Sequence, residues 1–561
     1  MATRDLPKSL GQLLFGWKNS VPNEITIHKS RAQLVEEDYQ PDGDKVRKFT
    51  WSSCWPAFAA GFGLFSDGYV NASIGSVSTI LGIMYPTEYK GSNAVNNVSS
   101  IAFVGIVVGQ LSFGYIADRI DRKKGMLAAN VILIVFTILC SAATWGANGS
   151  VYGMFAALTT FRFFLGVGIG AEYPTASVIS SEFANQLPSG IRNRVFAMST
   201  NCAINLGFVT AAFVPLILLW IFSPDHLTAV WRLTLGLGAI PPIALFFLRL
   251  KMVDSKVFKK YNMKHAKYPV WLCLKFYWYR LAVISALWFI YNFSAFSFGI
   301  YSSAIINNIV PDGDLYKTFG WNTLLNVFYL PGCFLGAFFA DWFGVRITLT
   351  TGLICQAVFG FAMAGAYPTL KQHVASFVVV FGFFTAFGEF GPGNSMGLIS
   401  SKLSATAVRG VFYGIAAAMG KIGAFVGTWV FPVIIKNAGG SDTDSGNQAP
   451  FYVSSSLCLF AALLAWFFLP YVGQDSINRE DDAFLEYLHA NGYDISQLGD
   501  RDSADSYSED IENQSAGYDN GMMKQADSYD EDSGKQPSYN DEVIEIDHTV
   551  LSEQKAFSSP K

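Results

Sequence analysis

The chain has 561 residues, of which 51% are hydrophobic and 15% aromatic, and its mean hydropathy is +0.31. Only 15% of the residues are charged, whereas soluble domains carry about a quarter. This composition excludes a soluble enzyme and indicates an all-α protein that crosses a membrane several times. The seven cysteines show no CxxC or Cys/His spacing, so we expect no metal site, no disulfide framework and no cofactor.

Twelve apolar windows follow a polar N-terminal segment that has no cleavable signal peptide. Each is close to the length of about 20 residues that a membrane-spanning helix needs. They lie at 52–76, 98–117, 126–146, 151–179, 195–222, 230–250, 281–308, 319–340, 346–367, 375–399, 408–435 and 450–473.

Lysine and arginine are concentrated in alternate loops. The basic loops hold Arg119, Arg122, Lys123, Lys124, Arg192, Arg194, Arg346, Lys402, Arg409 and most of the lysines of the central loop. The positive-inside rule then predicts that both termini and the central loop are cytoplasmic. The predicted domains are an N-terminal segment (1–50), a first six-helix half (51–250), the central loop (251–280), a second six-helix half (281–473) and an acidic tail (474–561).

The two halves repeat each other. GYIADRIDRKK, with Asp118, follows the second window, and GAFFADWFGVR, with Asp341, follows the eighth. Ile179-Ser180-Ser181-Glu182 recurs as Ile399-Ser400-Ser401-Lys402. The offsets are nearly equal, which indicates a duplicated six-helix unit of the kind found in transporters.

The fourth window contains charges that are costly at membrane depth. Arg162 and Glu172 lie in FRFFLGVGIGAEYPTASVISSE, and such groups normally face a partner, a cavity or a solute. Glu172 could act in transport or could form a structural ion pair. Gly166 and Gly170 form a small-xxx-small pair, which predicts close helix packing rather than a nucleotide-binding loop.

The two repeated loop motifs resemble the loop signature of the major facilitator superfamily, G-x-x-x-D-R-x-G-x-R-K. The resemblance implies a twelve-helix fold in two six-helix halves. It also implies a conformational latch at helix ends, made of Asp118, Arg119 and Arg122 in the first copy and Asp341 and Arg346 in the second. The second glycine of the signature is replaced here by Asp121.

Longer motifs narrow the resemblance. FSDGYVN, GAEYPTASVISSEFAN, LCLKFYWYR and GPGNSMGLISSKLSATAVRGVFYGIAAAMGKIG resemble the fungal glycerophosphodiester permeases, a branch of the phosphate:proton symporters. The similarity covers about residues 45–495. It implies that Asp67 and Glu172 couple protons, and that Lys421, Tyr173 and Trp288 contact the substrate.

One position departs from the symporter pattern. Phosphate symporters carry an aspartate where Asn292 stands, and an amide cannot exchange a proton in this way. The proton route is therefore expected through Asp67 and Glu172 or another acid. Glu389 is an additional carboxylate in the tenth window.

The residues themselves favour transport of an anion. A phosphodiester carries one negative charge, and Lys421 is the only Lys or Arg well inside a second-half window. It either binds substrate or pairs permanently with a carboxylate such as Glu389. A quaternary ammonium head group would need a carboxylate or aromatic faces. Glu389 therefore favours glycerophosphocholine over glycerophosphoinositol, for which only Asn292, Asn394 and Ser395 stand out as hydrogen-bonding partners.

The tail changes in character after residue 473. Residues 481–491 predict a short amphipathic helix, with Phe484, Leu485 and Leu488 on one side and Gly492 as the C-terminal cap. The remainder is acidic and is expected to be disordered. Kinases acting on Ser506, Ser508 or Ser528, and ubiquitin machinery acting on Lys524 or Lys535, are the expected partners of this tail.

The sequence thus predicts a plasma-membrane carrier that takes up a glycerophosphodiester with protons by alternating access. The alternatives are an inorganic phosphate:proton symporter and a nutrient receptor that moves no solute. The expected partners of the remaining chain are the substrate, protons and the lipid bilayer, and no nucleic acid.

Overall fold

The computed structural model describes residues 9–29, 50–144, 146, 149–250, 255–310 and 313–499. The predicted modification sites of the tail lie outside the described residues. Two short helices, α1 (Leu10–Phe15) and α2 (Trp17–Glu24), precede the membrane-spanning part.

The first half contains ten α-helices that make up six spans. They are α4 (Trp51–Gly61), α5 (Gly63–Met84), α6 (Ala94–Arg119), α7 (Arg122–Ser141), α8 (Val151–Glu172), α9 (Val178–Asn185), α10 (Arg192–Ser199), α11 (Asn201–Phe222), α12 (Leu227–Gly236) and α13 (Ile240–Arg249). Several spans are built from two helices in succession. The π-helix η3 (Tyr173–Ser177), which contains Pro174, joins α8 to α9.

The second half follows α14 (Lys256–Tyr261). Its helices are α15 (Val270–Ile309), α16 (Leu315–Val327), α17 (Tyr329–Trp342), α18 (Val345–Gly365), α19 (Tyr367–Leu370), α20 (Val374–Gly388), α21 (Asn394–Lys402), α22 (Arg409–Asn437) and α23 (Asp444–Phe468). The π-helix η7 (Glu389–Gly393) joins α20 to α21, and the helix α24 (Ser476–Ala490) follows the last span.

Within the described residues, eleven helical spans are long and apolar enough to cross a membrane. The first predicted window corresponds to α4 and α5, which are not among the eleven. Ser66, Asp67, Asn71 and Ser73 lie in α5 and are all buried, so this helix is polar toward the protein interior. The twelve predicted windows therefore correspond to twelve helical spans.

One boundary differs clearly from the prediction. The helix α15 begins at Val270, so the second part of the segment assigned to the central loop is helical. That segment, LCLKFYWYR, carries Lys275 and Arg280, and these two charges had indicated a loop. In the fold, the Arg280 guanidinium donates a hydrogen bond to the carbonyl of Leu403, which stabilises the charge near the helix start.

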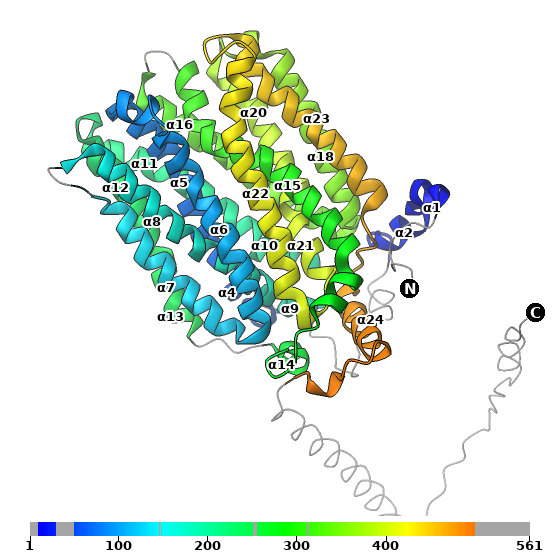
Figure 1. Ribbon diagram of the computed structural model, residues 1–561. Helices are drawn as coiled ribbons and strands as arrows, with labels where there is room; N and C mark the ends of the chain where they lie inside the picture. The colour runs from blue at the N-terminus through cyan, green and yellow to red at the C-terminus, as the bar shows by residue number, and fades with distance from the viewer. Residues whose placement is uncertain are drawn as a thin grey trace, which may run out of the picture. The chain divides into compact units, whose positions relative to one another are not determined.

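Three spans from each half form the interface between the halves (Figure 1); α10 and α11 belong to one span, and α16 and α17 to another. The helix α6 packs against α22, α5 against α15, α11 against α16, and α10 against α17. The helix α6 also packs tightly against α8, which carries the glycine pair Gly166 and Gly170. Side chains at Gly166 and Gly170 would collide with the carbonyl oxygens of Ala102 and Ile106 in α6, which confirms close packing at this small-xxx-small pair.

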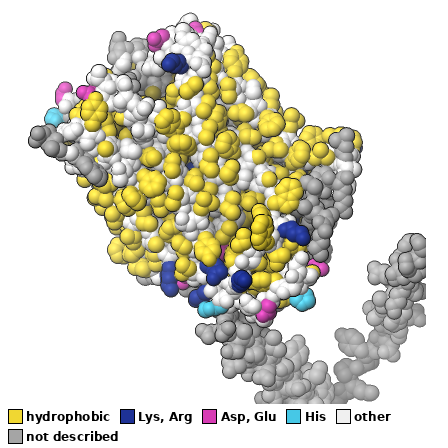
Figure 2. All heavy atoms as spheres, viewed as in Figure 1, with side chains coloured by type: hydrophobic (Ala, Val, Ile, Leu, Met, Phe, Trp, Pro, Cys, Tyr) yellow, Lys and Arg dark blue, Asp and Glu magenta, His cyan; other side chains and the backbone are white. Residues whose placement is uncertain are grey.

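Charged side chains gather at one end of the bundle. Figure 2 shows hydrophobic side chains across the middle of the visible face and a cluster of Lys and Arg near α14 and α24. We call this the basic end. Arg192, Arg346, Lys402 and Arg409 are buried and belong to it, because they contact residues within or just before α24. Arg122 lies beside Arg409, since both pair with Glu182. The end at which α16 and α20 begin is called the opposite end.

The amphipathic helix predicted in the tail is present as α24. Its side chains Phe484 and Leu488 are fully buried, and Phe484 packs on Phe276 and Tyr277 of α15. Gly492 follows with φ of +76°, as expected for a glycine that ends a helix in the left-handed conformation.

Candidate functional site

A cavity with a volume of about 100 Å³ lies between the two halves. Its walls come from α5, η3, α10 and α11 of the first half and from α15, α16, α17, η7, α21 and α22 of the second. Of the six predicted substrate residues, four are aromatic or amide side chains and two are charged. The six are Tyr173, Trp288, Asn292, Glu389, Asn394 and Lys421, and the structure brings all of them together.

Lys421 lies in the middle of α22 with 2% of its surface exposed. Its ammonium lies 3.6 Å from the ring centroid of Phe296 and 5.1 Å from that of Tyr173. It is within electrostatic range of Asp67 and Glu389, but it forms no ion pair with a carboxylate in the described part of the chain. The cavity therefore holds a positive charge that rests on aromatic faces.

Glu389, in η7, is held by hydrogen bonds from both halves. Its Oε2 accepts hydrogen bonds from the side-chain amides of Asn201 (3.0 Å) and Asn205 (2.9 Å), both in α11. Its Oε1 accepts one from the hydroxyl of Tyr291 in α15 (2.8 Å). Glu389 is thus not the fixed counter-ion of Lys421, which was the structural alternative for that lysine.

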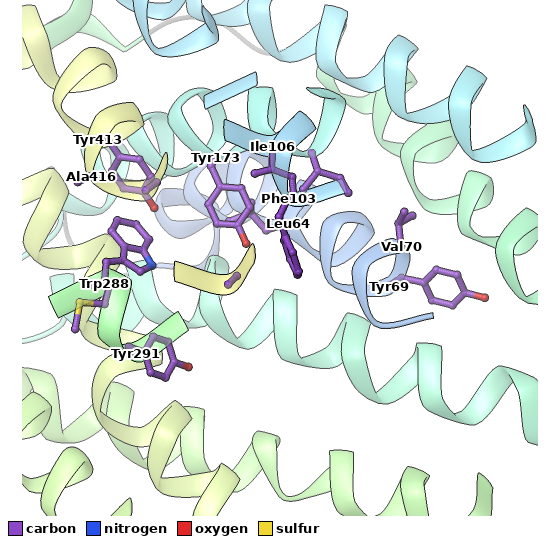
Figure 3. Close-up of a cluster of buried hydrophobic side chains, with 14 of the residues drawn as sticks. Leu64, Tyr69, Val70, Phe103, Ile106, Tyr173, Trp288, Tyr291, Tyr413 and Ala416 are labelled. Atoms are coloured by element: carbon purple, nitrogen blue, oxygen red, sulfur yellow. The ribbon is translucent and has the colours of Figure 1, made fainter. Parts of the chain in front are cut away.

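The cavity walls combine aromatic rings with amides. Figure 3 shows Tyr173, Trp288, Tyr291 and Tyr413 in one region, and the rings of Trp288 and Tyr413 meet edge to face at 5.6 Å. Asn394 accepts a hydrogen bond from Asn201 and donates one to the carbonyl of Cys333.

The cavity is richer in hydrogen-bonding groups than the sequence suggested. Beyond the expected Asn292 and Asn394, the polar side chains that line it are Asn71, Ser177, Thr200, Asn201 and Asn326. Ser395 is buried elsewhere, and its hydroxyl has no hydrogen-bond partner. The shortage of hydrogen-bonding groups, on which the preference for choline partly rested, is therefore not present.

Asp67 lies in α5 behind the cavity wall and is fully buried. Neither carboxylate oxygen has a hydrogen-bond partner. It is within electrostatic range of Glu172, Arg249 and Lys421. Asn71, one turn further along α5, lines the cavity itself, so Asp67 and the cavity share one face of the helix.

Glu172 is paired with Arg249, at the end of α13. The guanidinium of Arg249 also donates hydrogen bonds to Oδ1 of Asn130 (2.9 Å) and to the carbonyl of Ala60 (3.0 Å). A side chain at Gly63, one turn before Asp67, would collide with both members of the pair. Glu172, at the end of α8, therefore packs against the face of α5 that carries Asp67, and its buried partner Arg249 was not predicted from the sequence.

The first latch motif joins the halves at the basic end. The carboxylate of Asp118 accepts hydrogen bonds from the backbone N–H groups of Gly410 (2.9 Å) and Val411 (2.7 Å), in the first turn of α22. Arg122 pairs with Glu182 and donates a hydrogen bond to the carbonyl of Thr406 (3.1 Å). Arg119 instead stacks on Tyr115 and stays apart from this contact.

The second latch motif forms the equivalent contact from the other half. Asp341 accepts hydrogen bonds from the backbone N–H groups of Asn193 (3.0 Å) and Arg194 (3.2 Å), at the start of α10. Arg346 donates to the carbonyls of Trp466 and Pro470 and lies 3.5 Å from Glu24. Each aspartate therefore caps the N-terminus of a helix in the opposite half.

Neutral hydrogen bonds join the halves at the opposite end. The indole of Trp429 in α22 donates to the hydroxyl of Ser100 in α6 (2.9 Å), and Thr79 in α5 bonds Ser303 in α15 (3.1 Å). Contacts between the halves thus lie on both sides of the cavity, with charged groups on one side and neutral groups on the other.

Two six-helix halves, a cavity between them and contacts on both sides define a multi-pass membrane transporter. The chain belongs to the sugar (and other) transporter family, whose model matches residues 56–268 and 253–479. Its fold is that of the major facilitator superfamily. The solved structure of the proton:xylose symporter XylE bound to 6-bromo-6-deoxy-D-glucose matches with a TM-score of 0.65 and 16% identity, covering 78% of this chain and 100% of that one.

Fungal relatives are much more similar in sequence. The glycerophosphocholine permease GIT4 of Candida albicans is 58% identical over 91% of this chain and 96% of its own. The major glycerophosphoinositol permease GIT3 of the same organism is 57% identical over 89% of this chain and 95% of its own. The resemblance to glycerophosphodiester permeases is confirmed.

Three partners at these sites were not found from the sequence. Asn201 and Asn205 are one turn apart in α11, and this i, i+4 spacing of two amides in an apolar window was the signal for them. Arg249 lies at the end of a predicted window, where it looks like any basic residue beside a cytoplasmic loop.

Proposed function

We propose that the protein takes up glycerophosphodiesters together with protons across the plasma membrane, by alternating access. The observation that carries the proposal is the ammonium of Lys421, which lies in the cavity between the halves without a carboxylate partner. A phosphodiester monoanion supplies the missing charge. Lysine presents a point charge on a flexible stem, so it can hold an anion and release it again.

The direction of transport requires a coupled cation. Moving one negative charge into a cell against a negative interior costs roughly 2.3 kcal/mol per 100 mV. Symport of one proton with a monoanion is electroneutral and is driven by the pH gradient alone, whereas each further proton also uses the membrane potential. A zwitterion such as glycerophosphocholine is driven by a single proton.

Asp67 is the proposed proton carrier, with Glu172 beside it. An ionised carboxylate is costly to bury without partners, and Asp67 has none. Lys421 lies within electrostatic range, so an anion that neutralises Lys421 changes the field at Asp67. Glu172 and Arg249, which form an ion pair, lie within electrostatic range of Asp67, so their charges also act on its carboxylate.

The arrangement fits a closed intermediate of the transport cycle. We assign the basic end to the cytoplasm, in accord with the positive-inside rule, so that both termini are cytoplasmic. Asp118 and Asp341 then act as the conformational latch of the cytoplasmic side, and Trp429 and Thr79 belong to the external contacts. Inward opening breaks the former set and outward opening breaks the latter.

The head group is not restricted to choline in this proposal. The two relatives named above differ in head group and are almost equally similar to this chain. The cavity offers aromatic faces for a quaternary ammonium and amides for inositol hydroxyls. The preference for glycerophosphocholine through Glu389 stays a prediction.

Uptake by cells that lack their own carriers tests the function. We expect accumulation of labelled glycerophosphocholine and glycerophosphoinositol that rises with an inward proton gradient and collapses with a protonophore. Accumulation of inorganic phosphate alone would show the alternative symporter, and no uptake of any of the three would favour a receptor. Kinases and ubiquitin machinery acting on the tail, in a segment beyond the described residues, are proposed to set the number of carriers at the surface.

A further inference from the structure

The hydrogen bonds around Glu389 are unusual for a buried acid in a membrane protein. The Glu389 residue is 6% exposed, and its carboxylate accepts hydrogen bonds from three neutral donors, Asn201, Asn205 and Tyr291. Within the described chain it forms no ion pair. These four residues, which we call the Glu389 cluster, line or adjoin the cavity on the side of α11 and η7.

We propose that the Glu389 cluster binds the glycerol hydroxyls of the substrate. This inference rests on the proposed function and names the part of the substrate that this side of the cavity recognises. A glycerophosphodiester carries two adjacent hydroxyl groups, each of which is a donor and an acceptor. A carboxylate flanked by amides provides both kinds of partner.

The carboxylate has unused capacity on the side of Tyr291. An ionised carboxylate offers about four acceptor sites, and three are occupied here. Oε2 takes two donors, from Asn201 and Asn205, whereas Oε1 takes only the hydroxyl of Tyr291. One substrate hydroxyl can therefore bond Oε1 without displacing a protein donor. The second hydroxyl can bond the amide of Asn201, which otherwise bridges Glu389 and Asn394.

The absence of a side chain at Gly393 leaves the space that the Glu389 carboxylate occupies. A methyl group at Gly393 would collide with Oε2 of Glu389 and would lie 3.2 Å from Nδ2 of Asn201. Gly393 closes the π-helix η7, in which Pro392 removes one backbone donor. The irregular turn therefore positions the Glu389 side chain against α11, beside the cavity.

Charge places the other parts of the substrate. A carboxylate repels the phosphate group and attracts hydroxyl donors, while Lys421 attracts the phosphate. Lys421 and Glu389 both line the cavity and are within electrostatic range of each other. The phosphodiester therefore binds at Lys421 and the glycerol extends toward Glu389. Inorganic phosphate has no diol to place there and meets only the repulsion.

The cluster also joins the two halves. Asn201 and Asn205 belong to α11, whereas Glu389 and Tyr291 belong to η7 and α15. A diol that bonds Asn201 and Glu389 together adds contacts across the interface, so the glycerol group itself favours closure around the substrate.

Equilibrium binding to the purified full-length carrier tests the inference. Labelled glycerophosphocholine is displaced by unlabelled glycerophosphocholine, by glycerophosphoinositol, or by propylphosphocholine, which keeps the phosphocholine group and replaces glycerol with a propyl chain. In the wild type we expect glycerophosphocholine to bind at least tenfold tighter than propylphosphocholine, which corresponds to about 1.4 kcal/mol. Equal binding of the two in the wild type would overturn the inference without any variant.

Glu389→Gln should abolish most of that discrimination. It should weaken glycerophosphocholine and glycerophosphoinositol by about tenfold each and leave propylphosphocholine within about twofold. Asn201→Ala, which keeps the carboxylate, should move the same ratio in the same direction. Glu88→Gln, a half-buried acid that does not line the cavity, is the matched control.

Other patterns contradict the inference in distinct ways. Loss of glycerophosphocholine and propylphosphocholine together, with glycerophosphoinositol spared, would place the choline group at Glu389. Unchanged binding of all three ligands, with loss of accumulation driven by a pH gradient, would make Glu389 a proton carrier. Failure of the wild type to bind any glycerophosphodiester would instead refute the proposed function.

Discussion

Asp118 in α6 accepts a hydrogen bond from the backbone N–H of Gly410, the second residue of α22, at 2.9 Å. Asp341 in α17 bonds the N–H of Asn193 in α10 in the same way, at 3.0 Å. The duplicated loop motif thus produces a duplicated contact, in which an aspartate that ends a helix of one half caps a helix of the other. A carboxylate at a helix N-terminus is favoured both by hydrogen bonding and by the helix dipole.

Asp118→Ala should shift the carrier toward the state that is open at the basic end. Loss of an N-terminal cap costs about 1 kcal/mol, which corresponds to roughly a fivefold change in the equilibrium. The measurement is labelling of a cysteine introduced at Ser177, in a variant without the seven native cysteines, by a thiol reagent added from the cytoplasmic side. Asp121→Ala is the matched control, because Asp121 caps α7 within its own half. Equal labelling of the two variants would show that Asp118 is not part of a latch.

Lys421→Ala should abolish uptake while the amount of carrier at the surface remains unchanged. The substituted side chain removes the positive charge from the cavity, so no group of that sign offsets the phosphodiester. Surface biotinylation and initial uptake rates provide the measurement, with a loss of at least a hundredfold expected. Lys436→Ala, in the last turn of the same helix, should transport normally. Substantial transport by Lys421→Ala would exclude this lysine as the phosphate partner.

Asp67→Asn should separate accumulation from exchange. The amide keeps the shape of the side chain but carries no exchangeable proton, so a pH gradient should no longer drive uptake while substrate exchange persists. Preloaded vesicles measure both quantities. Accumulation with the pH dependence of the wild type would refute the role of Asp67.

Glu172→Gln carries a second expected effect. It leaves the buried Arg249 without its carboxylate, and breaking a buried ion pair typically costs about 3–5 kcal/mol. We expect a lower yield of folded carrier, and recovery of the yield when Arg249→Met is added. If the double variant recovers folding and also accumulates substrate, Glu172 is structural and takes no part in proton coupling.

Docking of the N-terminal segment should depend on pH. Burial raises the pKa of Glu24 from 4.5 to about 7, although Arg346 opposes the shift. The docked state therefore binds more protons than the undocked state between these values, so docking is strongest below pH 4.5 and weakens as pH rises toward 7. Hydrogen exchange of α2 at pH 5 and pH 8 measures this. Glu24→Gln should make protection in α2 independent of pH, and an unchanged pH dependence in that variant would assign it to another group.

Truncation should distinguish the packed part of the tail from the remainder. Gly499 donates its N–H to the carbonyl of Asn262, and the hydroxyl of Tyr493 donates to that of Lys267, so the chain is held as far as Gly499. A chain cut after Gly499 should keep the substrate affinity of the full-length carrier and remain longer at the surface. A chain cut after Val472 should lose the α24 contacts and fold poorly. Altered affinity after the first cut would instead indicate a sensing role for the tail.

The sequence predicted the spans well because lipid imposes a strong rule on length and polarity. Family motifs led to Tyr173, Trp288 and Lys421, whereas Asn292, Glu389 and Asn394 stood out as polar side chains inside apolar windows; all six line the cavity. It did not predict the partners of those residues, because Asn201, Asn205 and Arg249 are brought to Glu389 and Glu172 only by the packing of distant helices.

The start of α15 shows a different limit. Lys275 and Arg280 look like loop charges, and only the fold reveals that Arg280 lies 2.6 Å from Glu480 of α24 and bonds the Leu403 carbonyl. Charge in a sequence indicates depth relative to the membrane, but it does not indicate where a helix begins once another part of the protein offers a counter-ion.

The helix α15 is one uninterrupted rod of 40 residues. At about 1.5 Å per residue it is about 60 Å long, twice the thickness of the hydrocarbon core of a bilayer. Its middle supplies Trp288 and Asn292 to the cavity, and its first turns hold Glu480 through Tyr277 and Arg280. A tilt of α15 when substrate binds in the cavity would therefore displace α24. We propose that a modifying enzyme would therefore meet the chain after α24 in a different position in the loaded carrier and in the empty one.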